Sequence, residues 1–212
     1  MKRIIYAFIS ILVLATSCQD KKIKRSGKLD ISLLVYSNPT EDPYDMFVLP
    51  ISTMYFEKNN FLEIVQKYDK GLPIGQSFAL VNKDKYAVFE DLNSISEVKP
   101  NLLVKDKNIG VKFINDIVDY KRKENLTDTI LSGMKYKRAR IVSDSAYTVF
   151  YIHQTDTVLP FSLSPQFDKD YKGVLNRIDT YEKYHNRFTS LRLSVSDTIP
   201  KQYYNALKQV KQ

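Results

Sequence analysis

Residues 136–163 decide the fold, and they read YKRARIVSDSAYTVFYIHQTDTVLPFSL. The runs rich in Val, Ile, Tyr and Phe are typical of strands. They are interrupted at Asp144-Ser145 and at Thr155-Asp156, where short polar side chains favour turns. The pattern predicts a meander of three antiparallel strands over residues 136–143, 146–154 and 157–163.

Outside this stretch, strand and helix patterns are mixed. Strand patterns cover residues 29–37, 46–56, 77–81, 86–90, 102–105 and 191–195. Pro50 requires a bulge or an edge position in the second of these, because proline cannot donate to a ladder. Apolar residues at helical spacing predict helices over residues 60–71, 111–123 and 170–188, and a last helix that Thr198 caps. We therefore expect an α+β fold, in which a mostly antiparallel sheet packs against three to four helices.

Three regions are expected along the chain. They are a signal peptide over residues 1–17, the cysteine with a basic tether after it over residues 18–28, and a globular domain over residues 29–212. No long Gly/Ser-rich or Pro-rich linker and no internal repeat interrupts the last region, so it is predicted to be a single domain. A domain of that length buries a sizeable core without disulfides.

The first eighteen residues have the pattern of an export signal. Residues 1–3 (MKR) are positively charged, and the twelve residues from Ile4 to Ala15 are apolar. Crossing a membrane as a helix takes about 20 apolar residues, so this run is too short to span permanently. The run LATSC (residues 14–18) resembles a bacterial lipobox, with Ala15 where that family usually has leucine. The resemblance implies that Cys18 becomes a lipidated N-terminus that carries acyl chains such as palmitate. An ordinary secretory peptide with an incidental cysteine is the alternative.

The residues after Cys18 bear on its destination. Gln19, and not aspartate, follows the cysteine, which by the same resemblance indicates the outer membrane of a diderm bacterium. Asp20 stands alone before two lysines, so the acidic run that is associated with surface display in the Bacteroidota is missing, and the periplasmic face is expected. The many Lys, Asn, Tyr and Ile residues, the low Gly content and the absence of Trp resemble the composition of that phylum.

Charge and cysteine content narrow the chemistry. The formal net charge is +8, and removal of Lys2 and Arg3 with the signal leaves 30 basic and 24 acidic residues. This excess suits anionic lipid or polyanionic glycan, whereas no nucleic acid partner is expected in the envelope. Cys18 is the only cysteine, which excludes disulfides, thiolate nucleophiles and zinc–cysteine clusters. No metal-binding or glycine-rich phosphate motif occurs, so no metal and no cofactor is expected.

His153 is the weak catalytic candidate. It lies in the second strand of the meander, where it would act as a base beside Ser162 or Asp156. Its alternative role is packing, with a hydrogen-bonded ring nitrogen. A hydrolase that acts on envelope glycan or peptide would depend on this residue and an acidic partner.

A basic patch in the first strand of the meander is the candidate binding site. Strand alternation places Tyr136, Arg138 and Arg140 on one face. A tyrosine beside two arginines is a suitable docking surface for a carboxylate, a phosphate or a sugar acid. The alternative is a solvated edge strand that is kept charged against aggregation.

These observations predict a lipid-anchored envelope protein that acts as a non-catalytic binding or accessory module, most plausibly on another envelope protein. The hydrolase is the first alternative. A small-ligand carrier is the second, and it requires an apolar pocket between the meander and a helix.

Overall fold

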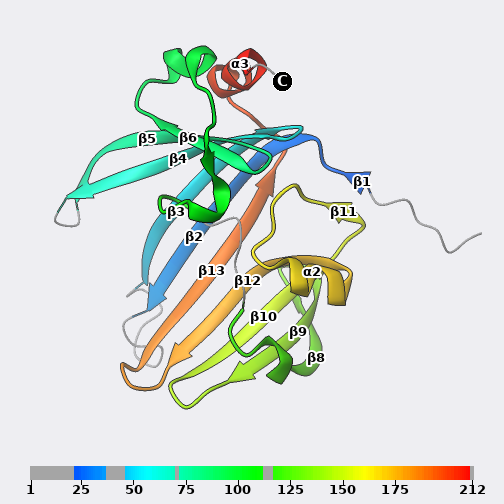
Figure 1. Cartoon of the computed structure of the whole chain (residues 1–212). Helices are drawn as coiled ribbons and strands as arrows, with labels where there is room; N and C mark the ends of the chain where they lie inside the picture. Colours follow the sequence, from blue (N-terminus) through cyan, green and yellow to red (C-terminus); the bar gives the residue numbers. More distant parts are fainter. Residues whose placement is uncertain (1–21, 37–45, 70–71, 112–116, 211–212) are drawn as a thin grey trace, which may run out of the picture.

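The protein is built around one large antiparallel sheet (Figure 1). The computed structural model describes residues 22–36, 46–69, 72–111 and 117–210. The sheet has the spatial order β7-β6-β5-β4-β3-β2-β13-β12-β10-β9-β8. Its strands are β2 (Ser26–Tyr36), β3 (Met46–Glu57), β4 (Asn60–Asp69), β5 (Leu72–Asn82), β6 (Lys85–Phe89), β7 (Leu102–Leu103), β8 (Glu124–Leu131), β9 (Met134–Val142), β10 (Ala146–Gln154), β12 (Gly173–Glu182) and β13 (Arg187–Ser196). β1 (Lys22–Ile23) and β11 (Thr157–Val158) form a separate parallel pair.

The expected α+β class is wrong, because the fold is largely β. Strands account for 58% of the described residues and helices for 16%. The helices are α2 (Pro165–Tyr171), α3 (Lys201–Gln209) and the short 3-10 helices η1 (Leu92–Glu97), η2 (Val104–Asp106) and η3 (Tyr120–Arg122). α3 confirms the last expected helix, although its N-cap residue is Pro200 and not Thr198.

The helix expected over residues 60–71 is wrong, since residues 60–69 form the strand β4 and residues 70–71 lie outside the described part of the chain. Both faces of this strand are buried: Phe61 packs on one side of the sheet, and Leu62 and Ile64 pack on the other. A strand that is buried on both faces lacks the alternation of polar and apolar residues that distinguishes strands from helices. Its apolar residues therefore matched a helical spacing by coincidence.

The helix expected over residues 170–188 is also wrong, since only residues 170–171 are helical, at the end of α2, and β12 and the start of β13 take up most of the remaining span. The register of β12 against β10 shifts between Tyr151 and Ile152, which leaves Asn176 without a partner in this ladder. Such a bulge moves the buried residues from one parity of the sequence to the other. Val174, Leu175 and Ile178 consequently imitate a helical face.

Two further expectations changed. Of the helix expected over residues 111–123, residues 112–116 lie outside the described part of the chain, and η3 is the only helical turn in the rest of it. β9 and β10 confirm the first two strands of the meander. Of the third strand, expected over residues 157–163, only the two residues of β11 are in a strand, and they pair with β1. Phe161 and Leu163, which follow Pro160 and flank Ser162, are buried but belong to no strand.

Several strand predictions are confirmed. The segments expected over residues 29–37, 46–56, 77–81 and 86–90 correspond to β2, β3, β5 and β6. The bulge expected near Pro50 is present, because Ile31 pairs with Ser52 while the next residue pairs with Pro50. β5 and β6 pair with each other as an antiparallel hairpin.

The sheet carries a separate core on each face. We call these the α2 face and the α3 face. Neighbouring residues of β3 belong to different cores: Met54 and Phe56 lie in the α2-face core, and Tyr55 lies in the α3-face core. The α2-face core extends across the sheet from β6 to β9, whereas the buried strand residues of the α3-face core are limited to β3, β4 and β5 beneath α3 and η1. Among the described helices, none packs on the α3 face of β9, β10, β12 and β13.

Strand order shows how the chain assembles. On one side of the sheet, β2 to β7 lie in sequence order, and on the other side β8 to β13 do the same, apart from β11. The pairing of β2 with β13 joins the two halves, and it brings together residues from opposite ends of the chain. Each half is therefore made of local hairpins, and one long-range ladder closes the sheet.

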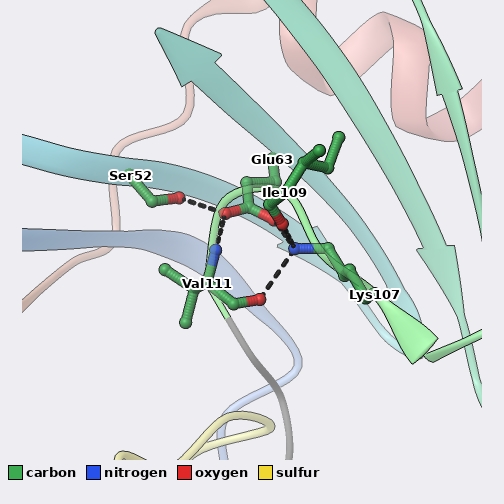
Figure 2. A network of polar contacts seen from close by, with 5 residues as sticks. All are labelled: Ser52, Glu63, Lys107, Ile109 and Val111. Carbon is green, nitrogen blue, oxygen red and sulfur yellow. Dashed lines mark hydrogen bonds and ion pairs between the residues drawn. The ribbon is translucent and has the colours of Figure 1, made fainter. Parts of the chain in front are cut away.

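A buried ion pair fastens a loop to the α2 face (Figure 2). Glu63 Oε1 accepts hydrogen bonds from Ser52 Oγ at 2.7 Å and from the Val111 amide at 2.6 Å. Lys107 Nζ lies 2.6 Å from Glu63 Oε2 and donates to the carbonyl oxygens of Ile109 and Val111 at 2.6 and 2.7 Å. Both charged side chains are completely buried. The loop of residues 104–111 thus supplies the counter-charge for a carboxylate in the middle of the sheet.

A substitution at Gly110 tests how much space is left beside the carboxylate of Glu63. Its φ is +59°, and a Cβ at this position would lie 2.2 Å from Glu63 Oε1. Gly133 is the matched control, because its φ is +77° but no heavy atom lies within 4 Å of the same point. Both Gly→Ala changes cost about 1–2 kcal/mol for the left-handed backbone. We expect Gly110→Ala to lose about 3 kcal/mol more in urea unfolding, because it disturbs a buried ion pair. Equal losses in the two variants would contradict this account.

Candidate functional site: an arginine row on the open face of the sheet

The structure places the three expected binding residues on one face of β9. Tyr136, Arg138 and Arg140 alternate with Ala139 and Ile141, which are buried in the α2-face core. The three side chains therefore lie on the α3 face, where the described helices leave this part of the sheet uncovered. β9 is not an edge strand, because β8 pairs with it. A solvated edge does not explain its charges.

The three residues differ in how available they are. Arg140 Nε donates to Glu124 Oε2 at 2.7 Å, and this hydrogen bond raises the pKa of the guanidinium. Tyr136 is 5% exposed, and its hydroxyl lies 3.4 Å from the Asn176 amide nitrogen. Arg138 donates through Nε to the Thr127 carbonyl at 2.8 Å. Arg138 is thus the member of the expected patch whose cation is not neutralised by a carboxylate of the described residues.

Neighbouring strands extend this charge into a row. Arg138 is in register with Tyr151 on β10, Tyr151 with Arg177 on β12, and Arg177 with Arg192 on β13. We call these four residues the arginine row. Adjacent strands lie about 4.8 Å apart, so the row spans about 14 Å across the sheet. Like charges directly opposite one another, as in Arg177 and Arg192, destabilise a sheet.

One carboxylate offsets the row. Arg177 Nε donates to the two oxygens of Asp179 at 2.8 and 3.0 Å, and this contact is the main reason that the pKa of Arg177 is raised. The guanidinium also lies 5.0 Å from the ring centre of Tyr151. Burial and the Asp179 charge raise the pKa of Tyr151, while Arg177 and Arg138 oppose them. Three arginines against one aspartate leave the row with an excess of two positive charges.

A hollow of about 440 Å³ borders the row where β12 and β13 separate. Their ladder ends at Arg177 and Arg192, next to the bulge residue Asn176. Asn176 Oδ1 is buried and has no hydrogen-bond partner among the described residues. The residues around the hollow are Leu131, Ser132, Met134, Tyr136, His153, Asn176, Arg177, Arg192, Leu193, Ser194 and Val195. It combines two guanidinium groups with amide, imidazole and phenol groups.

His153 lies at this hollow but lacks the partner that a catalytic base needs. Its Nδ1 is 3.4 Å from the Lys135 carbonyl, and its ring packs 5.7 Å from that of Tyr136. A second hollow of about 220 Å³ also borders it, and no Asp or Glu lines either one. Ser162 and Asp156, the partners considered from sequence, line neither hollow. The geometry around His153 fits packing and ligand contact better than proton transfer.

The interface between α2 and the meander strands is filled. Phe167 of α2 is fully buried, and its ring stacks on Phe150 of β10 at 4.4 Å. Leu175 of β12 and Ile152 of β10 are also fully buried in this core. The apolar space that a small-ligand carrier would need at this position is thus occupied by side chains.

Sequence reasoning missed Tyr151 and two of the three arginines of the row. Arg177 was assigned to a helix, so its register with Arg138 was not visible. Arg192 lies in a strand that was expected, but β12, with which that strand forms a hairpin, was assigned to a helix, so the register of Arg192 with Arg177 was not visible either. The polar residues at every second position of β13 were the available signal.

Two searches of the described residues bear on other kinds of site. Three or more His, Cys, Asp or Glu side chains do not gather anywhere in residues 22–36, 46–69, 72–111 and 117–210 in a way that would hold a metal ion. Within the same residues, no helix has the length and apolar character needed to cross a membrane.

Comparison with known proteins gives weak likenesses. No protein family model and no curated protein matches the chain. A DUF1329 family protein from Desulfovibrio piger is 7% identical, covers 91% of this chain and 92% of its own, and has a TM-score of 0.23. A putative outer membrane lipoprotein-sorting protein domain from Vibrio parahaemolyticus is 11% identical, with 93% and 97% coverage and a TM-score of 0.24. These TM-scores are too low to indicate a shared fold, so we infer nothing about this chain from either protein.

Asp179→Asn tests the charge balance of the row. Asp179 is 5% exposed, and loss of its charge weakens the hydrogen bonds to Arg177 and leaves Arg177 facing Arg192 without a counter-charge. We expect a loss of about 2 kcal/mol in the free energy of unfolding. The pKa of Tyr151 should fall, because a charge that raises it is removed while Arg177 and Arg138 remain. NMR titration of the tyrosine Cζ signal measures this shift.

Glu182→Gln on the same strand is the matched control. Glu182 accepts a hydrogen bond from Arg187 at 2.7 Å at the exposed end of β12. It should change stability less than Asp179→Asn and leave the pKa of Tyr151 where it is. An unchanged Tyr151 pKa in the Asp179 variant would show that the row is not electrostatically coupled.

Proposed function

We propose that this chain is a lipid-anchored envelope protein that binds anionic groups of an envelope partner at the arginine row and carries out no reaction of its own. The groups are carboxylates, phosphates or sugar acids. The observation that carries the proposal is the register of Arg138, Arg177 and Arg192 on a part of the sheet that the described helices leave open. The partner is a protein or a glycan of the envelope that presents several such groups.

The chemistry of arginine supports an anionic ligand. A guanidinium presents several N–H donors in one plane, which matches the paired oxygens of carboxylate and phosphate. Among the described residues, neither Arg138 nor Arg192 has a carboxylate partner, and Arg192 Nε donates only to Ser190 Oγ at 3.2 Å. An extended ligand would satisfy these donors one after another along the row. Its negative charge would also offset the repulsion between Arg177 and Arg192 that is present in the protein without a ligand.

The lipid anchor is supported by sequence. Cys18 and the lipobox-like run before it lie outside the described residues, and the proposal for them rests on the signal pattern. A lipidated Cys18 would hold the domain at the periplasmic face of the outer membrane. At that face, an arginine row would meet anionic glycans and acidic protein surfaces.

Arg192→Gln tests the binding site. With polygalacturonate and polyphosphate as probes in isothermal titration, we expect affinity for both to fall about tenfold, as for loss of one charge-assisted hydrogen bond. Arg122→Gln is the control, because Arg122 is exposed on η3 and pairs with Asp119 at 3.5 Å. It should leave binding unchanged, and neutral dextran should bind neither protein. Equal affinity of the Arg192 variant and the unaltered protein would refute the site.

Cys18→Ala tests the anchor. The unaltered protein should fractionate with outer membranes, and the variant should be recovered in the soluble periplasmic fraction. Affinity purification of both tagged proteins from gently solubilised membranes then tests for a partner. A protein that is recovered in stoichiometric amount with the unaltered chain, and is lost with both Cys18→Ala and Arg192→Gln, fits the proposal. Recovery of the unaltered protein in the soluble fraction would exclude the anchor.

A further inference from the structure

The end of the domain next to Cys18 lies close to the membrane if the cysteine is lipidated. The basic tether was expected to extend from Cys18 to Lys28, but the structure places residues 22–23 in β1 and the chain from Ser26 onward in β2. Three residues, Gln19 to Lys21, remain between the cysteine and the described domain. An extended chain advances at most about 3.6 Å per residue, so Lys22 lies within about 14 Å of Cys18.

A hollow of about 620 Å³ lies at this end of the domain. Its lining is apolar at Ile23, Phe61, Val158, Leu159 and Pro160, and basic at Lys24, Arg25, Lys58 and Lys83, with Asn59 completing it. No acidic residue lines it. Lys24 pairs with Asp197, whereas Arg25, Lys58 and Lys83 have no carboxylate partner among the described residues. Three cations without counter-charge thus surround an apolar depression.

The fold builds this hollow from segments that are distant in sequence. The Lys24 amide donates to the Val158 carbonyl at 3.0 Å, which extends the pairing of β1 with β11 (Figure 1). The Lys58 amide donates to the Arg25 carbonyl at 2.6 Å, and this hydrogen bond joins the β3–β4 turn to the segment between β1 and β2. Lys58 and Lys83 have φ values of 55° and 54° in their turns. Lysine is uncommon in this left-handed region, where glycine or asparagine costs less.

We propose that this hollow seats the phosphate of an anionic phospholipid headgroup in the bilayer that holds the lipid anchor. Arg25, Lys58 and Lys83 supply the charge that an anionic headgroup complements. Ile23 is 70% exposed and Val158 is 36% exposed, so both present apolar surface at the depth where headgroups meet acyl chains. The inference rests on the proposed anchor at Cys18, because the short connection brings this end of the domain to the membrane surface.

The arginine row is not part of this site. No residue lines both this hollow and the one beside the row. Headgroup binding at the Lys58 end would fix the orientation of the domain on the membrane. The arginine row would then keep one orientation relative to the membrane when a protein or glycan partner binds to it.

Lysine labelling in nanodiscs tests the headgroup site. The lipidated, full-length mature protein is inserted into discs of phosphatidylcholine alone or with phosphatidylglycerol added, and amine acylation is measured by mass spectrometry. We expect labelling of Lys58 and Lys83 to fall about fivefold in the anionic discs, which corresponds to about 1 kcal/mol for a basic residue at an anionic surface. Lys121 and Lys135, which are exposed and lie outside the hollow, should be labelled equally in both discs.

Charge-reversal variants keep the test specific. Lys24 also lines the hollow and should likewise be protected in anionic discs. Lys58→Glu combined with Lys83→Glu should abolish this protection of Lys24, and circular dichroism checks that the variant is folded. Lys121→Glu combined with Lys135→Glu should leave that protection intact. Equal labelling of Lys58 and Lys83 in the two kinds of disc overturns the proposal, as does an equal fall at all lysines.

A second version of the experiment, in which the protein is attached to the discs artificially, separates the headgroup proposal from the anchor proposal. The Cys18→Ala protein with an N-terminal histidine tag is held on discs through a nickel-chelating lipid. If the unaltered protein fails to join discs, the anchor proposal fails, and the labelling pattern of the tethered protein decides the headgroup site by the same criterion. Protection of Lys58 and Lys83 in anionic discs supports the site, and its absence overturns it.

Discussion

The covering of β4 on the α2 face depends on the ion pair between Glu63 and Lys107. A carboxylate at the centre of a sheet carries a desolvation cost of several kcal/mol, and it is tolerated only where a counter-charge and hydrogen bonds surround it. The loop of residues 104–111 supplies both, and in doing so it brings Val104 and Val111 into the α2-face core. The ion pair therefore determines which segment covers β4. A purely apolar contact would not distinguish this loop so sharply from any other apolar segment.

The parts of the fold that were predictable are those in which one side of a strand differs from the other. β9 alternates between core and charged residues, and the face that carries Tyr136, Arg138 and Arg140 followed from parity alone. β4 and β12 were mistaken for helices, β4 because it is buried on both faces and β12 because its bulge at Asn176 changes the parity halfway. In both, tertiary contacts decide the structure and the local pattern is ambiguous.

The same distinction applies to the candidate site. Residues within one strand could be placed on a face, but a row across four strands requires the order of those strands. The order of these strands was hidden because β12, which pairs with β10 on one side and β13 on the other, was taken for a helix. Arg177 and Arg192 come into register with Arg138 through β10 and β12. The neutralisation of Arg140 by Glu124 was equally hidden, because β8 was not among the expected strands.

The position of β2 has a mechanical consequence for an anchored protein. β2 follows β1 within a few residues and is hydrogen-bonded along both edges, to β3 on one side and to β13 on the other. A pull on the N-terminus therefore loads two long antiparallel ladders in shear, so that many hydrogen bonds share the force. A terminal strand at the edge of a sheet would instead peel away one bond at a time. An anchor at Cys18, as proposed, would thus pull on a strand that is held along both of its edges.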